Sequence, residues 1–426
     1  MHPAAQTVIA EWLEETVLPD LVERDVTHPP LDSLNQILAV VGPRRAGKTF
    51  YFFQQIRCLL AAGKRKQDIL MVDFEDYRLA GLRTDPMGEL LEAFHALTGH
   101  LPEYLFLDEI QQLPDWSRVV RTLHNQRKFK IVISGSNSQL LARELATELR
   151  GRCLETRLLP FSFAEYLRLK GQEFTPAQWH TAARGSIQSA FQDYLHHGGF
   201  PDVAMADSPM HRRQLLQGYF ETIYYKDILE RHEIRAKGTL EAMMRHLIDQ
   251  AGDLFSISAF SRTLEARGLP ASKRTLANYL GYLEGAFFVI PSEKFAYSQR
   301  KRTANPVKCY LFDTGFRQLG IPFSENRGKL LENLVAIELR RRQKEFFYFR
   351  DKVECDFVIT ESDRPTACIQ VCWELNDSNR QREVNGLRAA AEALGTRDNM
   401  ILTLGQAGEE GGVTLLPITS WLLGWG

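Results

Sequence analysis

The sequence predicts an α/β protein made of about three domains. At roughly 150 residues per domain, its 426 residues allow three, each large enough to bury its own core. The apolar fraction of 44% and the charged fraction of 25% are ordinary for a globular chain. Near the N-terminus an apolar run, residues 37–41, precedes a helical segment, residues 49–62, and further apolar runs follow. Strands that alternate with helices are typical of a parallel sheet.

Charge balance, apolar runs and cysteine spacing indicate which partners and which cell compartment to expect. The chain has 52 Lys and Arg against 53 Asp and Glu, so any binding to nucleic acid must come from a local patch. Residues 1–20 carry acids and lack the apolar core of a signal peptide, and no apolar run reaches the ~18 residues that span a bilayer. Six scattered cysteines show no CxxC and no zinc spacing. We expect a cytoplasmic protein with free thiols and no membrane partner.

The first motif is a phosphate loop. Residues 42–49, GPRRAGKT, fit the pattern G-x-x-x-x-G-K-[ST], in which glycines let backbone amides turn toward phosphate oxygens. Lys48 would contact the β- and γ-phosphates, and Thr49 would place its hydroxyl on Mg²⁺. The helix that starts near Lys48 would direct its partial positive end at the same anion. We predict a nucleotide site formed by Gly42, Pro43, Arg44, Arg45, Ala46, Gly47, Lys48 and Thr49.

An acidic pair is the second element of this site. Asp108 and Glu109 follow a short apolar strand, Tyr104–Leu107. Asp108 would hold the water shell of Mg²⁺, and Glu109 would orient or deprotonate the attacking water. Taken alone, the pair could equally be solvated acids after a core strand. Next to a phosphate loop, the catalytic interpretation is favoured.

Two further strands complete the predicted nucleotide-binding sheet. Residues 68–76, DILMVDFED, form a strand inserted between the phosphate loop and the acidic strand, an arrangement typical of ATPases with a catalytic glutamate. In those ATPases the strand after the acidic pair ends in a polar sensor of the γ-phosphate. Here that strand, within FKIVISGSNSQLL, offers Asn137 or Ser136. Asn137 or Ser138 could also cap a helix, and both roles are compatible.

A charge-neutralising arginine is the remaining catalytic expectation. Arg150 and Arg152 precede the expected fifth strand, and we assign the role to Arg152. It would act within its own chain or on a neighbouring subunit, so a homo-oligomer stays open. An arginine before a strand is also common as a plain surface residue.

Seven stretches of the chain carry a family resemblance. In order they are GPRRAGKT, LFLDEIQQLPDW, ISGSNSQLL, GRCLETRLLPFSFAEYL, YLHHGGFPDV, YYKDIL and KCYLFDTG. This series resembles a large prokaryotic family that joins an AAA-type ATPase domain to a C-terminal domain of unknown function, and it covers nearly the whole chain. The resemblance implies ATP as the nucleotide, with Mg²⁺. It also implies a helical region over the ATPase core, winged-helix-like segments, and a part similar to restriction-type nucleases.

The middle of the chain is predicted to be helical over residues 161–238 and to form a winged helix over residues 239–315. The helix within IYYKDILERHEIR should pack by its apolar stripe and carry no catalytic residue. Two helices, residues 258–266 and 273–284, flank a Gly-Leu-Pro turn, and a strand, a basic wing and a second strand follow. Winged helices also serve as protein-packing units. If this one binds double-stranded DNA, the expected contacts are Lys273, Arg274, Arg300, Lys301 and Arg302.

The C-terminal part shows the frame of a nuclease without all its ligands. The resemblance implies an acid on a helix, an Asp on one strand and a Glu-x-Lys pair on the next. The chain offers Glu332 and Asp356, but Gln370 and Cys372 stand where Glu and Lys should be. Gln is a poor Mg²⁺ ligand, and Cys cannot replace an ammonium group. We expect an inactive nuclease-like scaffold, with residual DNA or protein binding left open.

These elements predict an α/β architecture. A P-loop ATPase with a parallel sheet and an extra strand comes first, followed by helical and winged-helix segments and an α/β nuclease-like domain. The leading function is a Mg²⁺-dependent ATPase that couples turnover to conformational change on DNA or a protein partner. The alternatives are a nucleotide-gated DNA- or protein-binding regulator with negligible turnover and, less favoured, an ATP-dependent nuclease. The expected domains are residues 1–160, 161–238, 239–315 and 316–426.

Overall fold

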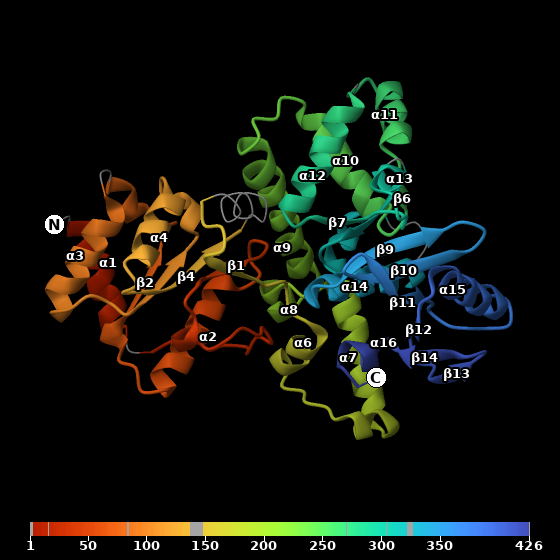
Figure 1. Cartoon of the computed structure of the whole chain (residues 1–426), viewed down its shortest axis with the longest axis horizontal. Coiled ribbons are helices and arrows are strands. Elements are labelled where there is room, and N and C mark those ends of the chain that lie inside the picture. The colour runs from red at the N-terminus through yellow and green to blue at the C-terminus, as the bar shows by residue number, and fades with distance from the viewer. Residues whose placement is uncertain are drawn as a thin grey trace. The chain divides into compact units, whose positions relative to one another are not determined.

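In the computed structural model the chain divides into two compact units, residues 1–159 and 160–426 (Figure 1). Within the part of the chain that the structure describes, no helix is both long and apolar enough to cross a bilayer. The finer division of the second unit into domains stays a prediction. The described residues are 3–15, 17–82, 85–136, 148–269, 271–303, 305–321 and 327–425.

The first unit is built on a five-stranded parallel sheet, which confirms the predicted architecture. Its order is β2-β3-β4-β1-β5, and every neighbouring pair is parallel. The strand that separates β1 from β3 in space is β4. The strand that separates them in the sequence, β2, lies at the edge of the sheet. The strands are β1 (Ile37–Val41), β2 (Ile69–Asp73), β3 (Tyr104–Asp108), β4 (Lys130–Gly135) and β5 (Cys153–Arg157).

Apolar side chains from the strands and helices fill the core of the first unit. Tyr51, Phe52 and Ile56 of the helix after the phosphate loop are fully buried against the sheet, and Phe52 meets Phe106 with ring centroids 5.4 Å apart. This packing fixes the helix that begins at Lys48, and therefore the loop before it. The described helices of this unit are α1 (Pro3–Glu14), α2 (Lys48–Ala61), α3 (Pro86–Thr98) and α4 (Trp116–Asn125).

The second unit begins with a helical region. The segment Ile223–Glu230, expected as an ordinary helix packed by its apolar stripe, is a π-helix. The expected stripe comprised four residues, of which Tyr224, Ile228 and Leu229 are buried, whereas Tyr225 is 52% exposed. The wider helical turn explains this, because it changes which side chains share a face. The helices of this region are α6 (Phe163–Leu169), α7 (Ala183–His197), α8 (Pro201–Met205), α9 (Pro209–Thr222) and α10 (Lys237–Asp249).

A small sheet and two helices follow. The sheet is antiparallel in the order β6-β8-β7. The basic residues expected in an extended wing between the last two strands lie instead in a short helix, α13 (Gln299–Thr303). The chain order of the other elements is β6 (Leu254–Phe255), α11 (Ile257–Ala266), α12 (Lys273–Gly285), β7 (Val289–Ser292) and β8 (Val307–Leu311).

The C-terminal part holds a six-stranded mixed sheet in the order β13-β14-β12-β11-β10-β9. The strands β9, β10 and β11 are antiparallel, and β11 then runs parallel to β12. The elements are α14 (Arg327–Arg341), β9 (Glu345–Arg350), β10 (Glu354–Glu361), β11 (Arg364–Val371), α15 (Arg380–Leu394), β12 (Asp398–Thr403), β13 (Gly408–Glu410), β14 (Val413–Pro417) and α16 (Ile418–Leu422).

Three of the stretches that carry the family resemblance pack against one another. Asp313, of KCYLFDTG, accepts hydrogen bonds from the backbone N–H groups of Gly199 (2.8 Å) and Gly315 (2.9 Å). The N–H of Phe161, of LLPFSF, donates to the carbonyl of Gly199 at 2.7 Å. These three stretches are therefore joined through buried backbone contacts, which assigns Asp313 a structural role.

Candidate nucleotide-binding site

The phosphate loop runs from the end of β1 to the start of α2. Gly47 has φ +91° and Arg45 has φ +65°, so the loop backbone turns through the left-handed region twice. At Gly42 the constraint is close approach, since a Cβ there would lie 2.0 Å from the carbonyl oxygen of Leu158. Helix α2 then starts at Lys48 and directs its unpaired N–H groups toward the loop.

Lys48 is folded onto the loop and the acidic strand. Its ammonium group donates to the carbonyls of Gly42 (3.3 Å) and Pro43 (3.1 Å) and lies 3.4 Å from Oε1 of Glu109. The side chain is only 4% exposed. A buried ammonium group held by backbone carbonyls and one carboxylate can exchange these partners for phosphate oxygens.

Asp108 ends β3 and contacts the phosphate-loop helix directly. Its Oδ2 accepts a 2.5 Å hydrogen bond from the hydroxyl of Thr49, and its Oδ1 accepts one from Ser134. Burial raises the pKa of Asp108, and the bonds from Ser134 and Thr49 oppose that rise. The two predicted magnesium residues therefore lie in contact.

Glu109 occupies a strained position at the start of the loop after β3. Its backbone is left-handed, with φ +46°, and its N–H donates to the hydroxyl of Ser134 at 3.1 Å. One carboxylate oxygen accepts from the Gln111 amide, and the other faces Lys48. Burial alone would raise the pKa of Glu109, but Lys48, Gln111 and Arg44 together lower it. Glu109 is thus held as a carboxylate beside the phosphate loop.

Of the two residues predicted to sense the γ-phosphate, Ser136 and Asn137, the structure describes only Ser136. Ser136 follows β4, which lies between β1 and β3. It is 1% exposed, and its hydroxyl has no hydrogen-bond partner among the described residues. A buried hydroxyl without a partner at the loop edge of the sheet fits a phosphate oxygen. Asn137 and Ser138 lie outside the described residues.

Arg152 does not lie at the phosphate loop of its own chain, so the prediction that it neutralises phosphate charge within the chain is wrong. Arg152 precedes β5, where its carbonyl accepts from the N–H of Ile37 at the start of β1. The phosphate loop follows Val41 at the other end of that strand. Because β1 and β5 are parallel, Arg152 lies at the opposite edge of the sheet. A role of Arg152 on a neighbouring subunit stays a prediction.

The structure adds residues that sequence reasoning missed. Arg24 is 5% exposed, and its guanidinium donates to the carbonyls of Ala46 (2.7 Å) and Leu159 (2.5 Å). These two hydrogen bonds tie the phosphate loop at Ala46 to the segment that follows β5. Asp73 ends β2 opposite Asp108, and partial desolvation, assisted by the neighbouring carboxylates, raises the pKa of Asp73 to about 6. Arg24 has no local sequence signal, but Asp73 ends a predicted strand and could have been included.

The nuclease-like acids form a second, separate cluster. Glu332 of α14 and Asp356 of β10 come together as expected, but a lysine from β8 lies between them. The ammonium group of Lys308 is 2.8 Å from Glu332 Oε1 and 2.9 Å from Asp356 Oδ1. Lys308 is 1% exposed. The cluster therefore does contain a cation, which comes from β8 and not from the strand that precedes Cys372.

The other two residues expected at the nuclease-like site, Gln370 and Cys372, make hydrogen bonds to neighbouring groups. The Gln370 amide accepts from the backbone N–H of Asp356 at 3.2 Å and donates to Glu383 at 2.8 Å. The Cys372 thiol donates to the carbonyl of Glu374. In the described ranges, no group of three or more His, Cys, Asp and Glu side chains is placed to hold a metal ion.

The five expected DNA contacts differ in their surroundings. Lys273, Arg274, Arg300 and Lys301 are exposed. Arg302 is not free for DNA, because its guanidinium covers the ring of Phe347 at 4.6 Å and its Nε donates to the carbonyl of residue 296 at 2.6 Å. Its role is to hold α13 against the C-terminal sheet.

Comparisons with known proteins define the class of protein. A family model described as an AAA domain matches residues 34–167. Two models described as domains of unknown function match residues 188–325 and 327–421. The chain therefore carries an AAA-type, P-loop ATPase-like domain followed by two domains of unknown function.

The particular family follows from full-length relatives. The chain belongs to the family of the uncharacterized protein MJ1544 of Methanocaldococcus jannaschii. It is 33% identical to that protein over 411 residues, which are 95% of this chain and 89% of the relative. An uncharacterized protein of Haemophilus influenzae is 29% identical over 394 residues, covering 91% of this chain and 94% of the relative.

Solved structures add a weak likeness. The Walker-type ATPase paby2304 of Pyrococcus abyssi matches with a TM-score of 0.41 and 14% identity over 68% of this chain and 92% of that chain. AMPPCP-bound DnaA from Aquifex aeolicus matches with a TM-score of 0.25 and 12% identity, over 60% and 84%. Both TM-scores are below 0.5, so neither likeness carries an inference about function.

Proposed function

We propose that this protein is a Mg²⁺-dependent ATPase that couples turnover to a conformational change on DNA or a protein partner. One observation carries the proposal. The loop lysine contacts the carboxylate of Glu109, and the hydroxyl of Thr49 contacts the adjacent Asp108. The next strand of the sheet, β4, is followed by a buried hydroxyl, Ser136, that has no partner among the described residues. The left-handed backbone at Arg45 and Gly47 is that of a loop whose amides turn toward a phosphate chain.

The chain's own residues then have separate tasks. Lys48 and the loop amides would hold the phosphates, and Thr49 and Asp108 would hold Mg²⁺, whose charge supplies electrostatic stabilisation when it is bound. Glu109 would accept a proton from the attacking water or orient it. Because Lys48 now contacts Glu109, its transfer to phosphate would release the carboxylate for that task. The pairing therefore keeps Glu109 restrained until the site fills.

The test separates binding from hydrolysis. Titration calorimetry with ATP and Mg²⁺ should show binding by the wild type and by Glu109→Gln, whereas Lys48→Ala should bind poorly. Phosphate release should occur only in the wild type. Arg57→Ala, an exposed change on the same helix as Lys48, serves as the control and should leave both measurements unchanged. No ATP binding by the wild type would refute the proposal.

A nucleotide-gated regulator is the second candidate. It is favoured by the same contacts, because Glu109 is held by both Lys48 and Gln111 and is not free to act. Under this candidate, hydrolysis is slow and unaffected by Glu109→Gln, while affinity for DNA or for a protein depends on ATP. The calorimetry and turnover data above decide between the two candidates.

We also propose that the segment from α10 to β8 is a winged helix that contacts double-stranded DNA. The order α10, β6, α11, α12, β7, β8 and the sheet order β6-β8-β7 support this assignment. Lys273 and Arg274 are exposed in the first turn of α12, and Ala277 and Asn278 are exposed one turn later. That face could enter a major groove. ATP turnover that rises on addition of duplex DNA would link the two units.

Nuclease activity is not part of the proposal. Lys308 forms ion pairs with both Glu332 and Asp356, the two carboxylates that would bind Mg²⁺ in an active enzyme of this type. Gln370 is meanwhile engaged with Glu383. Plasmid DNA incubated with the protein and Mg²⁺ or Mn²⁺ should stay intact. Cleavage that stops in Asp356→Ala would reverse this conclusion.

A further inference from the structure

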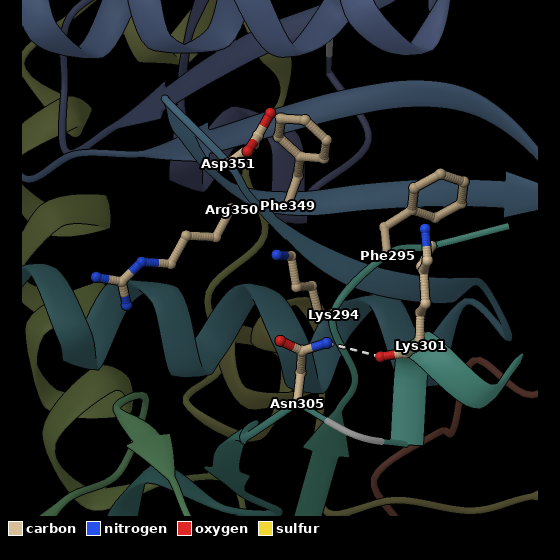
Figure 2. A pocket seen from close by; sticks show the side chains of 8 residues that line it. Lys294, Phe295, Lys301, Asn305, Phe349, Arg350 and Asp351 are labelled. Carbon is tan, nitrogen blue, oxygen red and sulfur yellow. Dashed lines mark hydrogen bonds between the residues drawn. The ribbon is translucent and has the colours of Figure 1, made fainter. Parts of the chain in front are cut away.

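A cavity of about 310 Å³ lies in the second unit, between the β7–β8 connection and the end of β9 (Figure 2). Three cationic side chains line it, Lys294 and Lys301 from the connection and Arg350 from β9. Among the described residues, none of the three has a carboxylate partner within 4.0 Å. The one acid in the lining, Asp351, leaves the cavity with a net positive charge. The cavity has the charge of an anion site.

The walls of the cavity are fixed by backbone contacts. The N–H of Phe295 donates to the carbonyl of Tyr348 at 2.7 Å, and the N–H of Tyr348 donates to the carbonyl of Glu293 at 3.0 Å. The connection is thus joined to β9 by a single β-bridge, in which Lys294 is paired with Tyr348. On α13, the Asn305 amide donates to the carbonyl of Lys301 at 2.6 Å, the dashed line in Figure 2. The cations therefore project from anchored segments.

An exposed aromatic ring lies beside this cavity. Tyr297, two residues after the lining residue Phe295, is 77% exposed. Its ring meets the buried ring of Phe295 edge to face, with centroids 5.2 Å apart and planes at 78°. The packing against Phe295 holds Tyr297 at the surface while leaving most of the side chain open to solvent.

We propose that this cavity and Tyr297 bind a single-stranded nucleic acid, with successive backbone phosphates along Lys294, Lys301 and Arg350, whose charged groups point in different directions (Figure 2), and with an unpaired base against Tyr297. Cations that follow the backbone, combined with an exposed ring for the bases, are the means by which proteins hold single strands. A duplex keeps its bases stacked within the helix, so it offers no base to Tyr297. The site is separate from the ATP site and does not depend on hydrolysis.

The experiment measures fluorescence anisotropy of a labelled 15-mer of thymidine with the full-length protein in the absence of ATP. Arg350→Glu and Lys301→Glu should each weaken binding at least tenfold. They should also lower the magnitude of the slope of log affinity against log salt by about 0.7 per cation removed. Tyr297→Ala should weaken binding about 5- to 100-fold with an unchanged salt slope, whereas Tyr297→Phe should bind like the wild type.

Arg364→Glu is the matched control for charge. Arg364 is exposed and starts β11, where its backbone lies opposite that of Glu361 at one end of β10. The backbone of Arg350 lies opposite that of Glu354 at the other end of β10. Seven residues of strand place the two sites roughly 23 Å apart. If Arg364→Glu weakens binding as much as Arg350→Glu, only net charge matters, and the proposal fails.

Binding of a duplex, and binding by the Tyr297→Ala and Lys48→Ala variants, test the proposal further. A duplex bound as tightly as the single strand and equally sensitive to Tyr297→Ala would overturn the role of the unpaired base. Full affinity of Tyr297→Ala would do the same. Lys48→Ala should bind the oligonucleotide like the wild type, so loss of the ATPase proposal would leave this one standing.

Discussion

Replacing Lys308 by Met should destabilise the second unit by about 3–5 kcal/mol. Removal of one partner from a buried ion pair typically costs this much, because an uncompensated charge stays behind. Lys308 is 1% exposed and contacts Glu332 and Asp356, which are 4% and 6% exposed. Methionine fills a similar volume, so cavity formation adds little. Since domains are stable by only about 5–15 kcal/mol, the loss is large.

The structure sets both the magnitude and the pH dependence of this loss. Lys329 remains 2.9 Å from Glu332 and compensates part of the charge, which places the expected loss near 3 kcal/mol. In the wild type, burial and the charge of Glu332 raise the pKa of Asp356 to about 6, while Lys308 opposes the rise. Without Lys308 that pKa rises further, so the folded variant binds more protons than the unfolded chain. Its deficit should therefore be larger at pH 8 than at pH 5.

Urea denaturation of the full-length protein, followed at the transition of the second unit, measures the effect. The control is Lys329→Met, whose side chain is 28% exposed and which should cost clearly less. Adding Asp356→Asn to Lys308→Met should recover part of the loss, because it removes one of the uncompensated charges. A loss below 1 kcal/mol, a loss equal to that of the control, or a deficit that grows at low pH would refute the reasoning.

Three other changes address the ATP site. Glu109→Gln should retain ATP affinity while turnover falls about 10²- to 10⁴-fold in a phosphate-release assay, and retained turnover would exclude Glu109 as base. Arg24→Ala should weaken ATP binding about tenfold by calorimetry, because two carbonyls lose a charged donor; unchanged affinity would remove its role in holding the loop. Gly42→Ala should lower the unfolding free energy of the first unit by about 1–3 kcal/mol, since its Cβ meets a backbone carbonyl at 2.0 Å, and denaturation at wild-type urea concentrations would contradict this.

The sequence was most informative where chemistry is encoded within a few consecutive residues. The phosphate loop and the acidic pair could be predicted because each is a local pattern at the end of an apolar strand. Strand order could not be predicted from adjacency in the chain, since β2 follows the loop in sequence but lies at the sheet edge. Arg24 was missed for a similar reason, because its contacts with Ala46 and Leu159 join segments 22 and 135 residues away.

The same limit explains the errors in the second unit. The basic run at residues 300–302 was expected as a uniform DNA contact, but Phe347, distant in the sequence, takes Arg302 for packing. A missing lysine at Cys372 suggested a site without a cation, yet Lys308 supplies one from 64 positions earlier in the chain. A motif search compares each position with its expected residue type. It cannot find a side chain such as Lys308, which contacts Glu332 and Asp356 from a strand outside the motif.

The contacts of the β7–β8 region also bear on how the second unit can transmit a change. On one side, Lys308 of β8 is buried between α14 and β10. On the other, the segment after β7 pairs with β9 through the backbone of Phe295 and Tyr348. A chain cut at residue 316 would leave the C-terminal sheet without Lys308 and without the bridge between Lys294 and Tyr348. The two domains of unknown function are therefore joined through buried charge and through backbone, and a movement of one relative to the other would break these contacts. If the proposed ATPase function is correct, we expect a change driven by ATP to move residues 160–426 as one unit.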